Sequence, residues 1–295
     1  MADVADELEA VFAEERPRLV GLAYRITGSR IDAEDLVQEA WLRAQRTEWT
    51  DIDNPAAWLT TVVSRLALDE LKSARRRRET YVGPWLPEPV RTAAPAATEE
   101  AVELAESLTL GFLRMLETLD PVERVVFLLA DVFQTPFGEI AKVVDRSPSA
   151  CRQVASRARR RVREGRHRHD PPEEAERVAG ELIVAVAAGD VAQVVSLLAD
   201  DVELLSDGGA AVRAARRPVV GPEKVARFLV NIAQRYRGSV VEVASINDEP
   251  GIVVQLHGKL EFALAVHVVD GKAHAFHAVR NYEKLAALDI QTPLT

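Results

Sequence analysis

The segment from Thr135 to Arg163 constrains the fold of this chain more than any other, because it reads as two helices joined by a tight turn. Pro136 and Pro148 stand where the first turn of a helix tolerates proline, and Thr135 and Ser147 precede them as expected N-caps. In the second helix, small and apolar residues recur at helical spacing and predict a buried stripe, formed by Cys151, Val154, Ala155, Ala158 and Val162.

The opposite face of this second helix is polar and cationic, which is typical of a recognition helix in a DNA groove. It carries Arg152, Gln153, Ser156, Arg157 and Arg160. Between positions 146 and 169 the chain has nine arginines against one acid, although its net charge is −9. A basic segment in an acidic chain is the electrostatic signature of a nucleic-acid module, although a solvated arginine-rich helix has the same composition. DNA is the first candidate partner.

Length and composition predict an ordinary globular protein of two or three domains. No apolar run approaches the roughly 20 residues of a membrane span, and the acidic N-terminus has no apolar signal core. The one cysteine, Cys151, excludes an internal disulfide and fits a reducing compartment. We therefore expect a cytoplasmic protein without membrane contact, and we expect neither a metal nor a cofactor.

Three helical signals organise the first part of the chain, residues 6–78. Apolar residues between Leu8 and Ala23 recur every three or four positions and indicate the first helix. Asp32 is a plausible N-cap for a second helix that buries residues from Leu36 to Ala44, and Asn54 followed by Pro55 opens a long third helix that ends in four arginines. Residues 79–104 then form a linker rich in proline and alanine, which predicts an extended and mobile chain. Trp85-Leu86-Pro87-Glu88-Pro89 stands out within it, either as incidental hydrophobicity or as a docking segment.

The chain returns to helical periodicity at residues 105–165, where Asp120 and Glu123 form an expected capping box. The pattern changes class over residues 174–286. Helices are predicted at 174–188 and 191–198, and strands at 240–243, 252–257, 259–269 and 274–280. Strict alternation within 259–269, followed by Asp270-Gly271, predicts a hairpin. This last part is therefore an α+β domain of about 110 residues.

The N-terminal helical module is built differently from the helix–turn–helix. A loop with aromatic and polar groups, residues 49–54, precedes a long helix that carries Trp58, Thr61 and Arg65. Aromatic and polar groups beside cations suit unpaired bases, which stack and form hydrogen bonds along their exposed edges. A chain that grips both duplex and melted DNA is similar to a transcription initiation factor.

Three motifs in this order carry the resemblance to a family. They are Asp32-Ala33-Glu34-Asp35-Leu36-Val37-Gln38-Glu39-Ala40-Trp41, Asn54-Pro55-Ala56-Ala57-Trp58-Leu59, and Phe137-Gly138-Glu139-Ile140-Ala141. Together they resemble an extracytoplasmic-function (ECF) RNA polymerase sigma factor, with its σ2 domain at 6–78 and its σ4 domain at 105–165. Residues 174–286 resemble the SnoaL-like, NTF2-fold extension of one group of these factors. The resemblance implies two all-α domains followed by an α+β cone.

The resemblance also implies partners and roles, namely core RNA polymerase, bound through the β′ clamp helices and the β flap, and promoter DNA. Contact with the polymerase clamp falls to Asp35, Gln38, Glu39 and Trp41. The resemblance assigns melting and capture of the −10 element to Trp49, Asn54, Trp58, Thr61 and Arg65. Reading of the −35 element falls to Ser147, Arg152, Gln153, Ser156, Arg157 and Arg160, while the cluster 159–163 contacts phosphates.

In the related group, the extension regulates the sigma factor in cis. We expect Trp85, Leu86 and Pro87 of the linker to contact Asp207, Gly208 and Gly209. The group carries Asp-Gly-Gly-Gly-Lys in this domain and Asn-Pro-Asp-Lys-Leu near its end. Here the corresponding residues are Asp207-Gly208-Gly209-Ala210-Ala211 and Asn281-Tyr282-Glu283-Lys284-Leu285, so the first motif has lost its lysine.

Other classes of function stay open at this point. A one-component transcription regulator could sense a small ligand in the C-terminal pocket without any polymerase contact. A SnoaL-type enzyme could abstract a proton beside a carbonyl, with an acid and histidines from the set Asp207, His257, His267, His274 and His277. An RNA-binding protein fits the charge, but the sequence has no aromatic platform of the RRM type. We expect a sigma factor and no catalysis.

Overall fold

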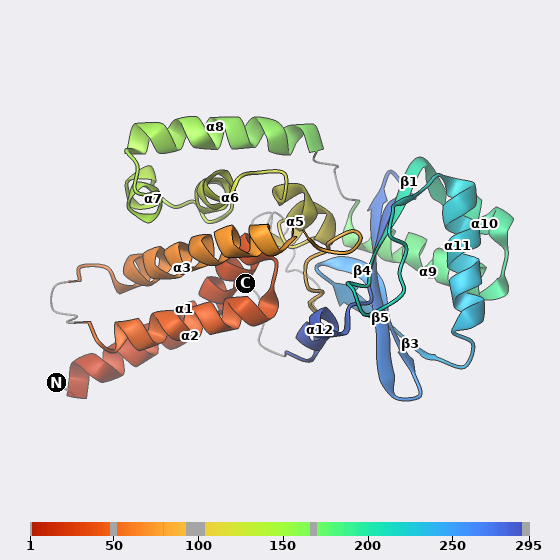
Figure 1. Ribbon diagram of the computed structural model, residues 1–295, viewed down its shortest axis with the longest axis horizontal. Helices are drawn as coiled ribbons and strands as arrows, with labels where there is room; N and C mark the ends of the chain where they lie inside the picture. Colours follow the sequence, from red (N-terminus) through yellow and green to blue (C-terminus); the bar gives the residue numbers. More distant parts are fainter. Residues whose placement is uncertain (1, 48–51, 79, 93–103, 166–169, 291–295) are drawn as a thin grey trace. The chain divides into compact units, whose positions relative to one another are not determined.

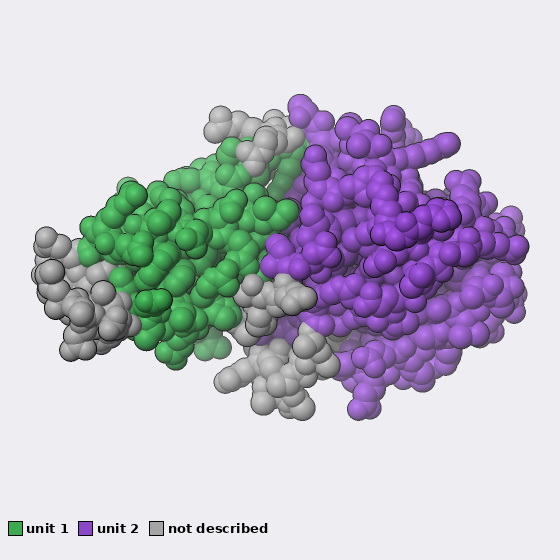
Figure 2. Space-filling model, turned by 90° about the horizontal axis from the view of Figure 1, so that it is seen from below, with its two compact units in different colours: residues 1–79, 115–166, 292–295 green, residues 80–114, 167–291 purple. Residues whose placement is uncertain are grey.

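The computed structural model describes residues 2–47, 52–78, 80–92, 104–165 and 170–290 (Figure 1). The chain divides into two compact units (Figure 2). Unit 1 consists mainly of residues 1–79 and 115–166, and unit 2 of residues 80–114 and 167–291. Among the described helices, none is long and apolar enough to cross a bilayer.

Unit 1 begins with three helices, α1 (Ala2–Thr27), α2 (Arg30–Ala44) and α3 (Pro55–Arg78). The cap of α2 was predicted wrongly. The helix starts at Arg30, and the Ser29 hydroxyl accepts a hydrogen bond from the Asp32 amide, so Asp32 lies in the first turn. The prediction for α3 is confirmed, because Asn54 Oδ1 accepts from the Ala57 amide and Pro55 opens the helix. Leu19, Leu22 and Val63 are among the fully buried residues of this bundle.

The helix–turn–helix completes unit 1. It contains α6 (Pro121–Phe127), η2 (Leu128–Val132), α7 (Phe137–Val144) and α8 (Pro148–Gly165). Asp120 and Glu123 form the predicted capping box of α6. Ser147 caps α8 as predicted, but α7 begins one residue late, with Pro136 rather than Thr135 as its N-cap. Proline lacks an N–H, so its place before the first helical residue leaves no donor unpaired. The predicted apolar stripe of α8 is buried, Cys151 included.

Unit 2 contains a six-stranded sheet in the order β2-β1-β6-β5-β4-β3. Its strands are β1 (Leu198–Asp207), β2 (Val219–Val220), β3 (Val240–Ile246), β4 (Glu249–Leu256), β5 (Lys259–Val269) and β6 (Lys272–Val279). All pairs are antiparallel except β1 with β6. The predicted hairpin at Asp270-Gly271 joins β5 to β6. The expected α+β class is confirmed.

The two faces of this sheet are covered by different parts of the chain. One face packs against α9 (Pro172–Ala188), α10 (Val191–Ser196) and α11 (Pro222–Arg235), and its core includes Leu182, Leu229 and Phe276. We call it the helix-covered face. The other face buries Leu86 and Leu110, which precede the domain in sequence, together with residues from α12 (Tyr282–Leu285) and η3 (Ala286–Asp289). We call it the linker-covered face.

The linker therefore has a defined place over its described part. The segment 86–90 is buried on unit 2, so the prediction of a mobile chain is wrong for these residues. Burial of Leu86 and Val90 supplies the hydrophobic free energy that a free proline-rich linker lacks. The helix α5 (Leu110–Leu116) follows, and the chain passes from unit 2 to unit 1 within it.

Candidate functional site

Helix α8, the predicted recognition helix, presents its polar residues outward, as expected. Arg152, Gln153, Ser156, Arg157 and Arg160 are all exposed. Arg152 lies over the ring of Phe137 at 5.4 Å, which holds its guanidinium at the start of the helix pair. Ser156, Arg159, Arg160 and Arg163 line a single hollow in the surface. This face can receive a phosphate backbone.

Two arginines of the predicted phosphate cluster have internal partners as well. Arg159 Nε lies 2.7 Å from Asp131, and Arg161 Nη1 lies 2.5 Å from Glu123. Glu123 is 4 % exposed and also lies 3.8 Å from Arg157. These pairs fix α8 on α6 and η2. Sequence reasoning missed them, because the acids lie 28 and 38 residues away in the chain.

The N-terminal site residues fall on α3 and the turn before it. Trp49 lies outside the described residues. Asn54 is exposed and caps α3, Trp58 is half-buried, and the Thr61 hydroxyl donates to the Ala57 carbonyl. Arg65 Nη2 donates to the Lys142 carbonyl at 2.5 Å, so the structure engages it with α7 rather than leaving it open.

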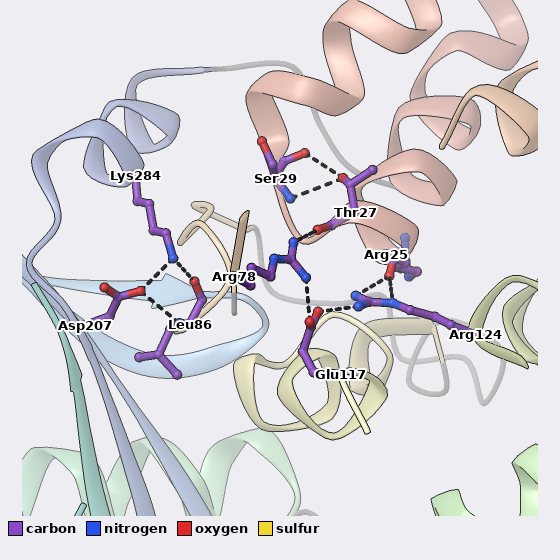
Figure 3. A network of polar contacts seen from close by, with 9 residues as sticks. All are labelled: Arg25, Thr27, Ser29, Arg78, Leu86, Glu117, Arg124, Asp207 and Lys284. Atoms are coloured by element: carbon purple, nitrogen blue, oxygen red, sulfur yellow. Dashed lines mark hydrogen bonds and ion pairs between the residues drawn. The ribbon is translucent and has the colours of Figure 1, made fainter. Parts of the chain in front are cut away.

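A buried network of ionic groups lies where α3 meets the second helical module. Glu117 bonds to Arg78 and Arg124, Arg78 also donates to the Thr27 carbonyl, and Arg124 donates to the Arg25 carbonyl (Figure 3). Burial alone would raise the pKa of Glu117, but Arg124 and Arg78 hold it below its usual value. Unit 1 therefore combines both helical modules in one closed body.

The predicted polymerase face lies on α2. Asp35 and Gln38 are exposed, while Glu39 pairs with Arg43 at 2.9 Å. Trp41 is half-buried and stacks on Phe12, with ring centroids 4.5 Å apart. The exposed residues leave an acidic surface for a basic partner, whereas Trp41 contributes to the helical core as well.

The carboxylate of Asp207 binds the linker directly. Its Oδ2 accepts from the Leu86 amide at 2.8 Å and from Lys284 Nζ at 2.6 Å (Figure 3). Its Oδ1 accepts from the Tyr81 hydroxyl at 2.6 Å. Asp207 is completely buried. Lys284 Nζ also donates to the Leu86 carbonyl. We call these four residues, Tyr81, Leu86, Asp207 and Lys284, the clasp.

The altered motifs still build this contact. Lys284 Nζ lies 4.3 Å from the ring centroid of Trp85 and 4.9 Å from that of Tyr81, so a cation is present although position 211 is alanine. The Gly209 amide donates to Asp207 Oδ1, and Gly209 has a φ of +57°. A Cβ at Gly208 would lie 2.4 Å from the Val212 carbonyl oxygen, so this turn has no room for a side chain. Pro87 is buried beside the clasp.

A second linker contact centres on Asn247, which the sequence did not single out. Its Oδ1 accepts from the Val90 amide at 3.0 Å, its own amide donates to the Val90 carbonyl at 2.9 Å, and its Nδ2 donates to the Leu108 carbonyl at 2.8 Å. Asn247 has a φ of +53° in the turn between β3 and β4 and is fully buried. One side chain thus ties Val90 of the linker to Leu108, which lies 18 positions further along at the start of the second module.

The five residues considered for catalysis fall at different places in unit 2, and none of them lines its apolar cavity. The helix-covered face encloses a cavity of about 380 Å³, lined mostly by apolar residues of α9, α11 and the sheet, and none of the five lines it. Asp207 binds the linker, His257 is exposed, and His274 lies 3.3 Å from Asp201 at the surface. His267 bonds to Glu249 at 3.1 Å and His277 is buried. Burial lowers the pKa of His277 to about 4.

The fold and the two helical modules define a σ70-type initiation factor, and comparison with known proteins agrees. Residues 11–77 match Sigma-70 region 2, and residues 110–162 match Sigma-70 region 4. The ECF RNA polymerase sigma factor SigJ of Mycobacterium tuberculosis is 43 % identical over 286 residues, covering 92 % of this chain and 91 % of SigJ. A probable ECF sigma factor from the same species, SigI, is 33 % identical and covers 93 % of each chain. The chain therefore belongs to the ECF sigma factors.

A solved structure extends this likeness to the C-terminal domain. The crystal structure of the M. tuberculosis ECF sigma factor SigJ has a TM-score of 0.77 and 40 % identity, covering 96 % of this chain and 99 % of that one. The predicted family and the order of two helical domains before an NTF2-like domain are confirmed. As an ECF sigma factor the protein acts in transcription initiation with RNA polymerase at promoter DNA.

Proposed function

We propose that the C-terminal domain regulates initiation in cis by holding the linker between the two promoter-reading modules. The single observation that supports this most directly is the pair of linker anchors, Asp207 on Leu86 and Asn247 on both Val90 and Leu108. Both anchors come from unit 2, and the linker they hold joins residues 6–78 to residues 105–165.

Simple geometry explains why the linker matters. The two promoter elements lie roughly 25 base-pair steps apart, which is about 85 Å along B-DNA at 3.4 Å per step. A compact body of about 130 residues has a radius of gyration of about 14 Å, and is therefore far smaller than that span. In unit 1, however, α3 packs against α6 and α7, and Arg65 bonds to Lys142. The closed body must open to read both elements.

Opening requires free chain between the modules. A released linker of about 30 residues could extend to about 100 Å. With Val90 and Leu108 both held by Asn247, the stretch between them adds no reach, because its two ends stay together. The C-terminal domain would thereby limit how far the modules separate, and would select promoters or hold the factor inactive.

The residue roles follow from exposure and charge. In our proposal α8 binds the −35 element through Ser147, Arg152, Gln153, Ser156, Arg157 and Arg160. Of these, Arg152, Gln153, Ser156 and Arg157 read bases, and Arg160 contacts phosphates. The turn and helix carrying Trp49, Asn54, Trp58, Thr61 and Arg65 act on the −10 element once unit 1 opens. The acidic face of Asp35, Gln38 and Glu39, with Trp41, docks on the basic polymerase clamp, and the second module on the flap. The site of action is the cytoplasm.

The test is transcription in vitro with core polymerase on promoters whose spacer length is varied. Asn247→Gly keeps the positive φ of the turn and removes both side-chain bonds to the linker, so we expect it to broaden the range of spacers used and to raise output from the longest. Asp248→Gly is the matched control, because it shortens a side chain in the same turn without touching those bonds. Equal spacer profiles for Asn247→Gly and the wild type would refute the proposal.

A further inference from the structure

The cavity on the helix-covered face has the size and the apolar lining of a small-molecule site. Its volume of about 380 Å³ lies in the range of small-molecule sites, with room for on the order of a dozen water-sized groups. Its apolar wall includes Leu182, Leu229, Val254, Phe262 and Phe276. Burial of apolar ligand surface against these side chains is favourable, whereas they offer no hydrogen bonds to a sugar or a nucleotide.

The polar end of the cavity lies where α11 runs into β3. Tyr236, Arg237 and Ser239 lie together there, and among the described residues that line the cavity, Arg237 is the one with a charge. Arg237 is exposed, and no hydrogen bond or ion pair of its side chain is found within the described residues. An apolar chamber with one cation at its end favours a ligand with one anionic group.

Tyr236 connects this end of the cavity to the linker clasp. Its hydroxyl accepts from Arg280 Nη2 at 2.6 Å, and Arg280 Nη1 donates to the carbonyl of Arg213 in the loop that follows Asp207. The backbone amide of Arg280 donates to the Asp207 carbonyl at 2.7 Å. Within the described part of the chain, the buried Nε of Arg280 has no acceptor, so Arg280 is held by fewer bonds than it can make.

We propose that the cavity binds an apolar monocarboxylic acid, with its carboxylate beside Arg237 and its hydrocarbon among the apolar residues, and that Tyr236 and Arg280 couple its occupancy to the clasp. The coupling rests on the proposed function of the linker, whereas the binding does not. A ligand packed against Tyr236 fixes Arg280, and Arg280 in turn holds the backbone of Asp207. Binding should therefore tighten the hold on Leu86.

Calorimetry on the full chain with dodecanoate, dodecanol and dodecylamine tests the binding. We expect dodecanoate to bind best. Arg237→Gln should weaken dodecanoate about tenfold, as expected for one charge-assisted hydrogen bond, and leave dodecanol unchanged. Arg235→Gln, which removes an exposed arginine of the same helix end that does not line the cavity, should stay within about twofold. Ala233→Phe, which fills the cavity, should weaken all binding. Failure of dodecanoate to bind, or equal binding to Ala233→Phe, would overturn the site.

Hydrogen exchange at the Leu86 amide tests the coupling without polymerase or promoter. Saturating dodecanoate should slow exchange of this amide at least threefold in the wild type. Tyr236→Phe should bind the acid and lose that effect, because it keeps the ring and removes the bond to Arg280. Binding with unchanged or faster exchange at Leu86 would refute the coupling while leaving the ligand site. A failure of the spacer experiment, by contrast, would refute only the proposed role of the linker.

Discussion

Asp207 and Lys284 form an ion pair of 2.6 Å whose carboxylate is completely buried and whose ammonium is 10 % exposed. Both side chains also bond to the backbone of Leu86, whose amide donates to the acid and whose carbonyl accepts from the lysine. Departure of the linker would therefore remove a hydrogen bond from each member of this buried pair. Removing one member of a buried ion pair costs more folding free energy than replacing both members with apolar residues of similar volume.

A double-mutant cycle should show that Asp207 and Lys284 stabilise unit 2 as a pair. Asp207→Asn leaves Lys284 buried without a counter-charge, so we expect it to lower the free energy of unfolding of unit 2 by about 3 kcal/mol or more. Lys284→Met should cost a similar amount, and the double variant Asp207→Asn with Lys284→Met less than the sum. Urea unfolding followed by tryptophan fluorescence measures each. Asp200→Asn, at an exposed position of the same strand, is the control. Strict additivity of the two single changes would contradict a direct pair.

Lowering the pH should reduce the free energy of unfolding of unit 2 through protonation of His277. Burial lowers the pKa of this imidazole to about 4 from an ordinary 6.5, so the unfolded chain binds its proton first as pH falls. The contribution of the neutral imidazole to the free energy of unfolding is therefore fully present above about pH 6.5. It is lost between about pH 6.5 and pH 4, by up to about 3 kcal/mol in all. Denaturation at several pH values measures the slope. His277→Gln should flatten it, whereas His257→Asn, at an exposed turn position, should not. An unchanged slope in His277→Gln would assign the effect to other groups.

Two neighbouring arginines of α8 should behave differently. Arg160 is exposed and lines the hollow of the recognition face, so Arg160→Ala should weaken DNA binding for all sequences and reduce the salt slope by about 1. Arg161 pairs with the buried Glu123, so Arg161→Ala should mainly lower the stability of unit 1. Binding titrations at several salt concentrations and thermal unfolding separate the two effects. The same loss of salt slope in both variants would show that Arg161 contacts phosphates too.

Removing the charge of Glu117 should open unit 1. This carboxylate bonds to both Arg78 and Arg124, whose guanidinium groups are mostly buried. Glu117→Gln leaves both cations short of an anion, and we expect it to destabilise unit 1 by about 3 kcal/mol. Hydrogen exchange along α3 should rise with it. Glu139→Gln, which removes a surface acid paired with Lys142, is the control and should have an effect below about 1 kcal/mol.

Sequence patterns predicted the elements with a strong local signal. β5 has the predicted bounds, because its alternation sets every second residue on one face, and the capping box of α6 was readable from Asp120 and Glu123. β1 was not predicted. Its two adjacent acids, Asp200 and Asp201, interrupt the alternation, and it is held as a strand by its partners β2 and β6 rather than by its own pattern. α11 was missed as well, although Pro222 marks its first turn.

The residues of the candidate site also differ in how far local sequence patterns predicted them. The outward residues of α8 follow from helical spacing, and all of those predicted are exposed. The resemblance indicated that Asp207 lies near the linker, but not that Lys284 supplies the cation, because 77 positions separate the two. Asn247 gave one available signal, since Asn followed by Asp between two strands is typical of a tight turn. Its contact with Val90 depends on the path of the linker, which no local pattern contains.

The contact of Asn247 with both Val90 and Leu108 has a consequence for how such chains can vary. If Asn247 limits the separation of the two modules as proposed, residues inserted between Val90 and Leu108 would leave that separation unchanged, because both anchor points stay in place. Loop-closure entropy rises only slowly, by about 0.6 kcal/mol for each doubling of length. On the proposed mechanism this stretch is therefore the place to insert a tag, a protease site or a fluorescent reporter, because the length of the insertion would leave promoter spacing unchanged and its cleavage would not break the bond of Asp207 to Leu86.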